Sequence, residues 1–170
     1  MKIETMDDLF LEQIEDLYDA EKRLVKALPK LASASTSGQL RQALESHLGE
    51  TKGHVDRLEQ VFQQIGKKAK GKTCPAMKGL VEEGEEVVSE IEESPLRDAG
   101  IISSGNRVEH YEIAAYGTAK TYAEMLGLDK AVALLEKTLE EEKKADAKLT
   151  KLAESLVNKQ ALQSGSMQRV

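Results

Sequence analysis

Four long segments of this chain carry apolar residues at alternating spacings of three and four, and each apolar stripe is interrupted near its middle by a glutamate. This spacing is typical of amphipathic helices that pack with their stripes facing one another. The interrupting residues are Glu21, Glu50, Glu112 and Glu142. An unpaired carboxylate in a helical core costs several kcal/mol, or takes up a proton because its pKa rises. Four of them at one level therefore call for a compensating positive charge, which a metal centre would provide.

Capping and turn residues divide the chain into five predicted helices, one of them short. Thr5 can cap the first, Gly66 ends the second, Ser94-Pro95 precedes the third long helix, and Gly127 marks a tight turn before the last. We expect helices over residues 5–34, 38–65, 74–93, 96–125 and 128–157. An aromatic content of 4% and three prolines agree with a helical bundle.

Two helical hairpins joined by a crossover of about 30 residues have the connectivity of a ferritin-like four-helix bundle. We therefore predict an all-α fold with one ferritin-like bundle over residues 1–160, a short extra helix in the crossover, and a disordered polar tail over 161–170. Each interrupting glutamate falls near the midpoint of its helix. All four carboxylates are thus expected at about the same height along the bundle.

The spacing of acids and histidines suggests how a metal would be held. In ferritin-like di-iron proteins, two helices each supply one Glu, and the other two each supply a Glu with a His one turn later. The candidate ligands here are Glu21 and Glu112 as single acids, and Glu50 with His54 and Glu142 with Asp146 as i, i+4 pairs. The strict Glu-x-x-His motif is absent after Glu50, because Gly53 stands at its third position.

Two further residues lie next to this set. Glu109 precedes Glu112 by three positions and is predicted to be an additional ligand or a partner of one. His47 precedes Glu50 by three positions, and it either binds metal or orients a ligand through a hydrogen bond. With one imidazole in place of two, the set favours hard ions, so manganese and magnesium are candidates beside iron for a dinuclear centre.

A metal-free arrangement is the alternative. A single Glu on an apolar stripe is usually at the edge of the stripe, where it reaches solvent or pairs with a basic residue. Arg57 and Arg107 are close enough in sequence to neutralise some of these acids in an ion-pair network.

Charge and hydropathy exclude several classes of partner. A net charge of −6 and a pI near 5.3 argue against nucleic acid and against an anionic membrane surface. The sequence has no run of 18 apolar residues, and its start is polar, so we expect neither a membrane span nor a secretory signal, and we expect a cytoplasmic location. The single cysteine, Cys74, allows no internal disulfide.

Several long strings of residues resemble the YciF-like bacterial stress-response proteins, a branch of the ferritin-like superfamily related to rubrerythrin. The strings are Asp19-Ala20-Glu21-Lys22, His47-Leu48, Glu50-Thr51, Arg57-Leu58, Cys74 to Leu80, Val108 to Ala114, Tyr116-Gly117-Thr118 and Thr138 to Lys143. The resemblance covers nearly the whole chain. It implies a ferritin-like bundle, a homodimer and a link to osmotic, oxidative or general stress, and it supplies no established reaction.

Together these observations lead to two hypotheses of different classes. The first is a stress protein whose dinuclear centre oxidises ferrous iron or reduces peroxide, with a separate electron donor because the sequence carries no Cys-rich electron-transfer module. The second is a non-catalytic dimeric helical protein whose buried acids form an ion-pair network. Iron storage is a third hypothesis, and it requires a high-order cage.

Overall fold

Helices account for nearly all of the part of the chain that the computed structural model describes, residues 2–166, and no strand occurs within it. The helices are α1 (Met6–Ala34), α2 (Gly38–Gln64), α3 (Pro75–Glu90), α4 (Pro95–Met125), α5 (Asp129–Leu152) and α6 (Asn158–Ser166), with a π-helical turn at Ala153–Val157. The predicted all-α class is confirmed. None of the helices in residues 2–166 is both long and apolar enough to cross a membrane.

The helix ends follow the capping residues in the sequence. The Thr5 hydroxyl accepts a hydrogen bond from the Asp8 amide, and the Asp8 carboxylate in turn accepts one from the Thr5 amide. Proline occupies the first turn of both α3 and α4. Gly66 and Gly127 have φ values of +66° and +68°, which are left-handed conformations that favour glycine, and each follows a long helix.

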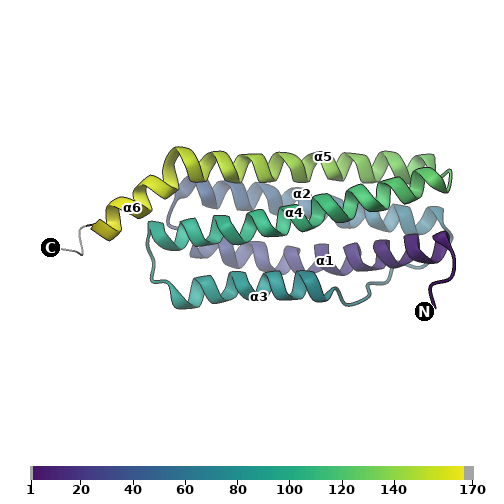
Figure 1. Ribbon diagram of the computed structural model, residues 1–170, viewed down its shortest axis with the longest axis horizontal. Helices are drawn as coiled ribbons and strands as arrows, with labels where there is room; N and C mark the ends of the chain where they lie inside the picture. Colours follow the sequence, from purple (N-terminus) through teal and green to yellow (C-terminus); the bar gives the residue numbers. More distant parts are fainter. Residues whose placement is uncertain (1, 167–170) are drawn as a thin grey trace.

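Two helical hairpins, α1–α2 and α4–α5, form a four-helix bundle, and α3 packs outside it against α1 and α4 (Figure 1). The crossover from α2 to α4 contains α3, as predicted. Cys74 lies at its start, where the buried sulfur caps α3 by accepting a hydrogen bond from the Met77 amide. This thiol therefore has a structural role.

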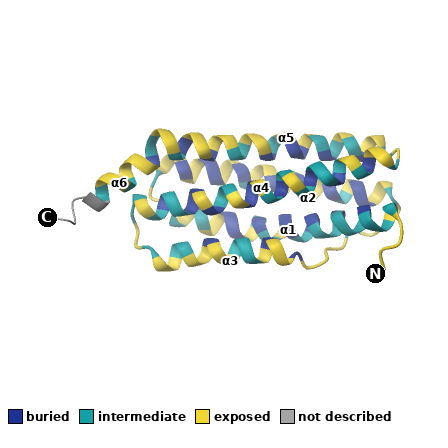
Figure 2. Ribbon diagram, viewed as in Figure 1, coloured by how far each residue is buried: buried dark blue, intermediate teal, exposed yellow. Residues whose placement is uncertain are grey.

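A layer of buried polar side chains divides the core into two apolar clusters. On α1 the layer begins after Leu17 and ends before Leu24, with Glu21 between them. On α5 it lies between Leu139 and Leu149. Buried residues continue along the inner faces of the bundle through this layer (Figure 2). The chain thus places buried charges at mid-height, as the interrupted stripes predict.

The C-terminal part differs from the predicted disordered tail over residues 161–170. The chain leaves α5 through the π-helical turn and continues as α6 to Ser166, while residues 167–170 lie outside the described residues. The turn is held by burial of Val157, and α6 packs against α4. Val157, at the predicted end of the last helix, is thus buried, and helical structure continues beyond it as α6.

Asp98 joins the two hairpins. Its buried carboxylate accepts hydrogen bonds from the Thr36 amide and hydroxyl and from the Ser37 amide, so the α1–α2 turn is fixed to the first turn of α4.

We expect Asp98→Ala to lower the free energy of unfolding by about 2–3 kcal/mol, because hydrogen bonds to a charged group are lost. Urea denaturation measures this. Asp129→Ala is the control, since Asp129 is exposed in the first turn of α5, and an equal loss there would contradict the prediction.

Candidate metal centre

Six buried side chains form two adjoining groups of metal-binding type at mid-height in the bundle. In each group the potential ligand atoms lie within 4.8 Å of one another. The first group contains His47, Glu109, Glu112 and Glu142, and the second contains Glu21, His54 and Glu142. Glu142 belongs to both, so its carboxylate is placed to bridge two ions. The six residues are only 0% to 6% exposed, which removes them from competing water.

Helical spacing explains why these residues meet. His47 and His54 are seven residues apart on α2, which is two turns, so both rings point to the same side. Glu109 and Glu112 are three residues apart on α4 and also share a face. Helices α1 and α5 each contribute one acid. The result is four carboxylates and two imidazoles from four helices.

Each of the two histidines turns one ring nitrogen toward the buried acids and the other toward a carboxylate outside the two groups. Nδ1 of His54 lies 2.9 Å from Glu142 Oε1 and 3.2 Å from Glu21 Oε1, while its Nε2 lies 3.1 Å from Glu141 Oε2. One nitrogen thus faces the buried acids and the other a carboxylate outside the two groups. Metal-ligating histidines typically have this arrangement, because the outer carboxylate fixes the ring and raises its basicity.

His47 repeats this geometry with its nitrogens exchanged. Nε2 lies 3.2 Å from Glu109 Oε1 and 3.6 Å from Glu142 Oε2, and Nδ1 contacts Glu50 Oε2 at 3.2 Å. Glu50 therefore stands to His47 as Glu141 stands to His54. The two imidazoles are oriented for one bond each into the centre.

Many polar atoms of the centre have no hydrogen bond within the described residues. They are Glu21 Oε2, Glu109 Oε2 and both carboxylate oxygens of Glu112, while His54 Nδ1 and the two oxygens of Glu142 have only their ion-pair contacts with each other, with Glu21 and with His47. Buried polar atoms are nearly always satisfied, so this concentration needs a missing partner. Divalent cations accept this set of oxygens and imidazole nitrogens. The residues present therefore fit a dinuclear metal site.

The pKa values show how the groups respond without a cation. Burial raises the pKa of Glu112 far above its usual range, and the charges of Glu142 and Glu21 add to this. Burial also raises the pKa of Glu21 and of Glu142, although His54 opposes it in both cases. Burial acts to lower the pKa of His54, yet the carboxylates of Glu142 and Glu21 raise it to about 10. Without a cation, burial therefore favours the neutral forms of Glu21, Glu112 and Glu142, while the neighbouring carboxylates favour the charged form of His54.

The two arginines of the metal-free alternative lie elsewhere. Arg57 pairs with Glu141 and donates to the Thr138 hydroxyl. Arg107 pairs with Glu83 at the surface, where both side chains are more than half exposed. Among the described residues, neither arginine forms an ion pair with the six buried groups, so the charge of the four acids is not balanced by arginine.

Five of the seven predicted ligands meet in the two groups, namely Glu21, His54, Glu109, Glu112 and Glu142. The other two, Glu50 and Asp146, lie outside both. Asp146 has a side chain that is 22% exposed, accepts a hydrogen bond from Asn106 and contacts His110 Nε2 at 3.3 Å. Asp146 does not lie in either group, whereas the second histidine, His47, lies in the first group.

Glu50 does not lie on the buried face of α2, where the apolar stripe predicts it. The buried residues of α2 at this level are His47, Thr51 and His54, with a spacing of four and three, whereas the Glu50 side chain is 45% exposed. The apolar stripe predicts a buried Glu50, whereas the helix buries the neighbouring Thr51. His47, which is predicted either to bind metal or to orient a ligand, lies inside the first group. Two imidazoles thus lie in the two groups, where the ligand set predicted from the spacing has one.

Glu50 is expected to support metal binding through His47. We predict that Glu50→Ala weakens metal affinity by about 10–100-fold but keeps full occupancy at saturating metal, as is usual when a residue orienting a ligand is lost. Competition with a chromogenic chelator measures the affinity. Glu45→Ala is the control, since Glu45 is exposed on the same helix. Complete loss of metal at saturation would instead make Glu50 a ligand.

Comparison with known proteins places this arrangement in a family. The model of the family described as "Domain of unknown function (DUF892)" matches residues 5–162. The chain belongs to the DUF892 family. Protein YciF of Escherichia coli (strain K12) is 48% identical to this DUF892 protein over 162 residues, which are 95% of this chain and 98% of YciF. The predicted resemblance to YciF-like proteins is confirmed.

Solved structures of similar proteins share the fold. The crystal structure of the E. coli stress protein YciF has a TM-score of 0.88 and covers 92% of this chain and 99% of its own. YcfI from Rhodopseudomonas palustris, described as a proposed structural protein, is 46% identical with a TM-score of 0.86, over 88% of this chain and 95% of its own. A DUF892 protein thus has close structural relatives whose names state a stress link or a structural role.

Proposed function

We propose that this protein is a stress-response protein that holds two iron ions between Glu21, His47, His54, Glu109, Glu112 and Glu142, and that it oxidises ferrous iron or reduces peroxide. The observation that carries the proposal is the shared carboxylate of Glu142 between two buried groups. Four carboxylates and two imidazoles are also the donor count of ferritin-like di-iron proteins. Two ferrous ions held by these residues would supply the two electrons that peroxide reduction needs.

The protein's own residues prepare the site for this chemistry. The Tyr116 hydroxyl donates a hydrogen bond to Glu21 Oε1, and burial together with the charge of Glu21 raises the pKa of Tyr116 far above its usual range, so the proton stays on the hydroxyl. Glu141 and Glu50 hold the two imidazoles from outside. Ionised carboxylates are the metal-binding form, so the raised pKa values of Glu21, Glu112 and Glu142 would make metal binding release protons.

Anaerobic loading with ferrous iron tests the proposal. We expect about two iron ions per chain and the oxidation of both by one added peroxide. Optical titration with hydrogen peroxide, compared with chelator-treated protein, gives this stoichiometry. No bound metal, or oxidation no faster than that of free ferrous iron, would favour the non-catalytic alternative. The homodimer, the cytoplasmic location and the separate electron donor belong to the same proposal, and gel filtration distinguishes a dimer from a storage cage.

A further inference from the structure

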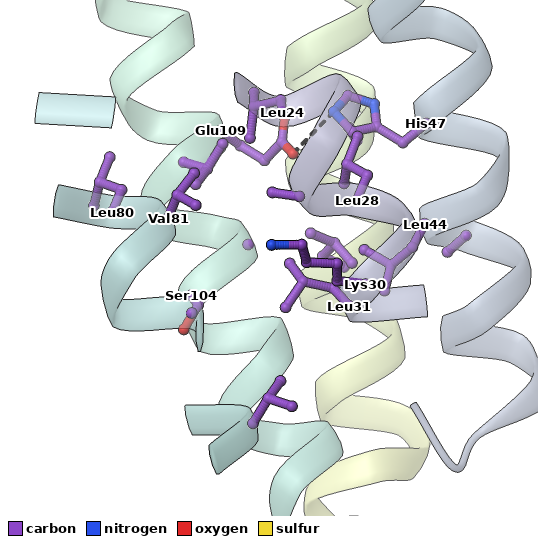
Figure 3. A pocket seen from close by; sticks show the side chains of 18 of the residues that line it. Leu24, Leu28, Lys30, Leu31, Leu44, His47, Leu80, Val81, Ser104 and Glu109 are labelled. Carbon is purple, nitrogen blue, oxygen red and sulfur yellow. Dashed lines mark ion pairs between the residues drawn. The ribbon is translucent and has the colours of Figure 1, made fainter. Parts of the chain in front are cut away.

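An elongated apolar cavity of about 230 Å³ adjoins the candidate metal centre. Its lining side chains come from the four bundle helices and from α3, and His47 and Glu109 lie together at one end (Figure 3). Along α1 it extends from Leu24, one turn beyond Glu21, to Leu31. Seven residues of helix correspond to about 10 Å, so the cavity leads away from the centre along the bundle axis.

Two buried polar atoms in the cavity lining have no partner among the described residues. The Ser104 side chain is 4% exposed, and its hydroxyl forms no hydrogen bond, although a helical serine commonly donates to a backbone carbonyl one turn earlier. Glu109 Oε2 is the second such atom. An apolar cavity with a few unsatisfied polar groups is typical of a small-molecule site, because a ligand completes the hydrogen bonds.

The cavity is accessible from solution. Lys30 on α1 and Glu85 on α3 both line it and form an ion pair at 2.8 Å, with side chains 68% and 50% exposed. The edge of the cavity at this pair therefore lies at the surface, where a side-chain rotation opens it further. A molecule from solution can reach His47 and Glu109 without unfolding of the bundle.

We propose that this cavity binds the organic part of an alkyl or aryl hydroperoxide and places its O–O group against His47 and Glu109. This inference rests on the proposed peroxide-reducing function and names its substrate class. A cavity of about 150 Å³ holds benzene, so 230 Å³ accommodates a benzene ring with a short branched substituent. Cleavage of the O–O bond takes two electrons, one from each ferrous ion, and two protons from solvent, and it yields an alcohol and water.

Binding of the product alcohol to metal-free protein tests the cavity separately from the chemistry. We expect calorimetry to show one site for 2-phenyl-2-propanol, the alcohol formed from cumene hydroperoxide. Gly84→Leu should bind it about tenfold more weakly or worse, because the new side chain enters the cavity. A Cβ at Gly84 would lie 3.8 Å from both Leu31 and Ser104, so the backbone need not move. Gly79→Leu, on the same helix outside the lining, should bind normally.

A single turnover by ferrous-loaded protein tests the substrate class. We expect Gly84→Leu to lower the second-order rate constant for oxidation of the loaded iron by cumene hydroperoxide by about tenfold while leaving that for hydrogen peroxide unaffected, since Gly84 is not among the ligands. Failure of wild-type protein to bind the alcohol would overturn the inference even if hydrogen peroxide is consumed. Alcohol binding without consumption of either peroxide would overturn the proposed function, and with it the hydroperoxide as substrate.

Discussion

Replacing Glu142 with glutamine is expected to remove both metal ions from the protein. The Glu142 carboxylate is the member common to the two groups, and its oxygens lie near both histidines. Glutamine keeps the shape but loses the charge that would neutralise part of each cation. Supporting residues cost up to about 100-fold in affinity, and the loss of a shared ligand should exceed this for both ions. Elemental analysis after anaerobic ferrous loading and desalting measures the outcome.

Glu140→Gln is the matched control for this substitution. Glu140 is two residues away on α5, and its exposed side chain pairs with Lys143 at 2.7 Å. We expect this variant to retain its metal. Circular dichroism would show whether Glu142→Gln still folds, which is expected because the change is isosteric and removes a buried negative charge. A folded Glu142→Gln protein with one tightly bound ion would mean that Glu142 is not a ligand common to two ions.

Metal removal is expected to destabilise the protein more at high pH than at low pH. Metal at about 1,000 times its dissociation constant adds about 4 kcal/mol to the free energy of unfolding. For a chain of this size that corresponds to a rise of about 8–16 °C in Tm. Protons compete with metal for the same ligands, so metal affinity, and with it the rise in Tm, should increase from pH 6 to pH 8.

The metal-free protein should respond to pH in the opposite sense. The pKa of Glu21, Glu112 and Glu142 is higher in the fold than the ordinary value of 4.5, and that of His54 rises from 6.5 to about 10. Such groups contribute stability that is fully present below the unfolded pKa and is lost as pH rises through the folded pKa. The Tm of chelated protein should therefore fall from about pH 5 toward pH 10.

Thermal scans at several pH values, with metal and with chelator, give both trends. Glu112→Gln should flatten the decline of the chelated protein, because neither oxygen of Glu112 has a hydrogen-bond partner within residues 2–166 and burial raises the pKa of this carboxyl. A chelated Tm that rises between pH 6 and pH 8 would show that these acids are balanced by some other cation of the protein.

The sequence was sufficient to predict the helices, the hairpins and the height of the site, because apolar period, caps and turn residues act locally. It was insufficient at Glu50, where two neighbouring positions on one helix face compete for the interior. Helix rotation, set by packing against α1 and α5, buries Thr51 and brings His47 inward. The cavity beside the centre also depends on packing of α3, which no local pattern reports.

The polar layer at mid-height has a consequence for cooperativity. Apolar packing holds each half of the core together, but the two halves meet through a layer of buried acids and histidines in which several oxygens lack a hydrogen bond within residues 2–166. Bound ions would connect the halves into one unfolding unit. Without them, amide hydrogen exchange in the half that contains Phe10 should differ from that in the half that contains Leu40, because each half can open on its own. Metal loss would then change how the bundle unfolds before it changes the average shape of the bundle.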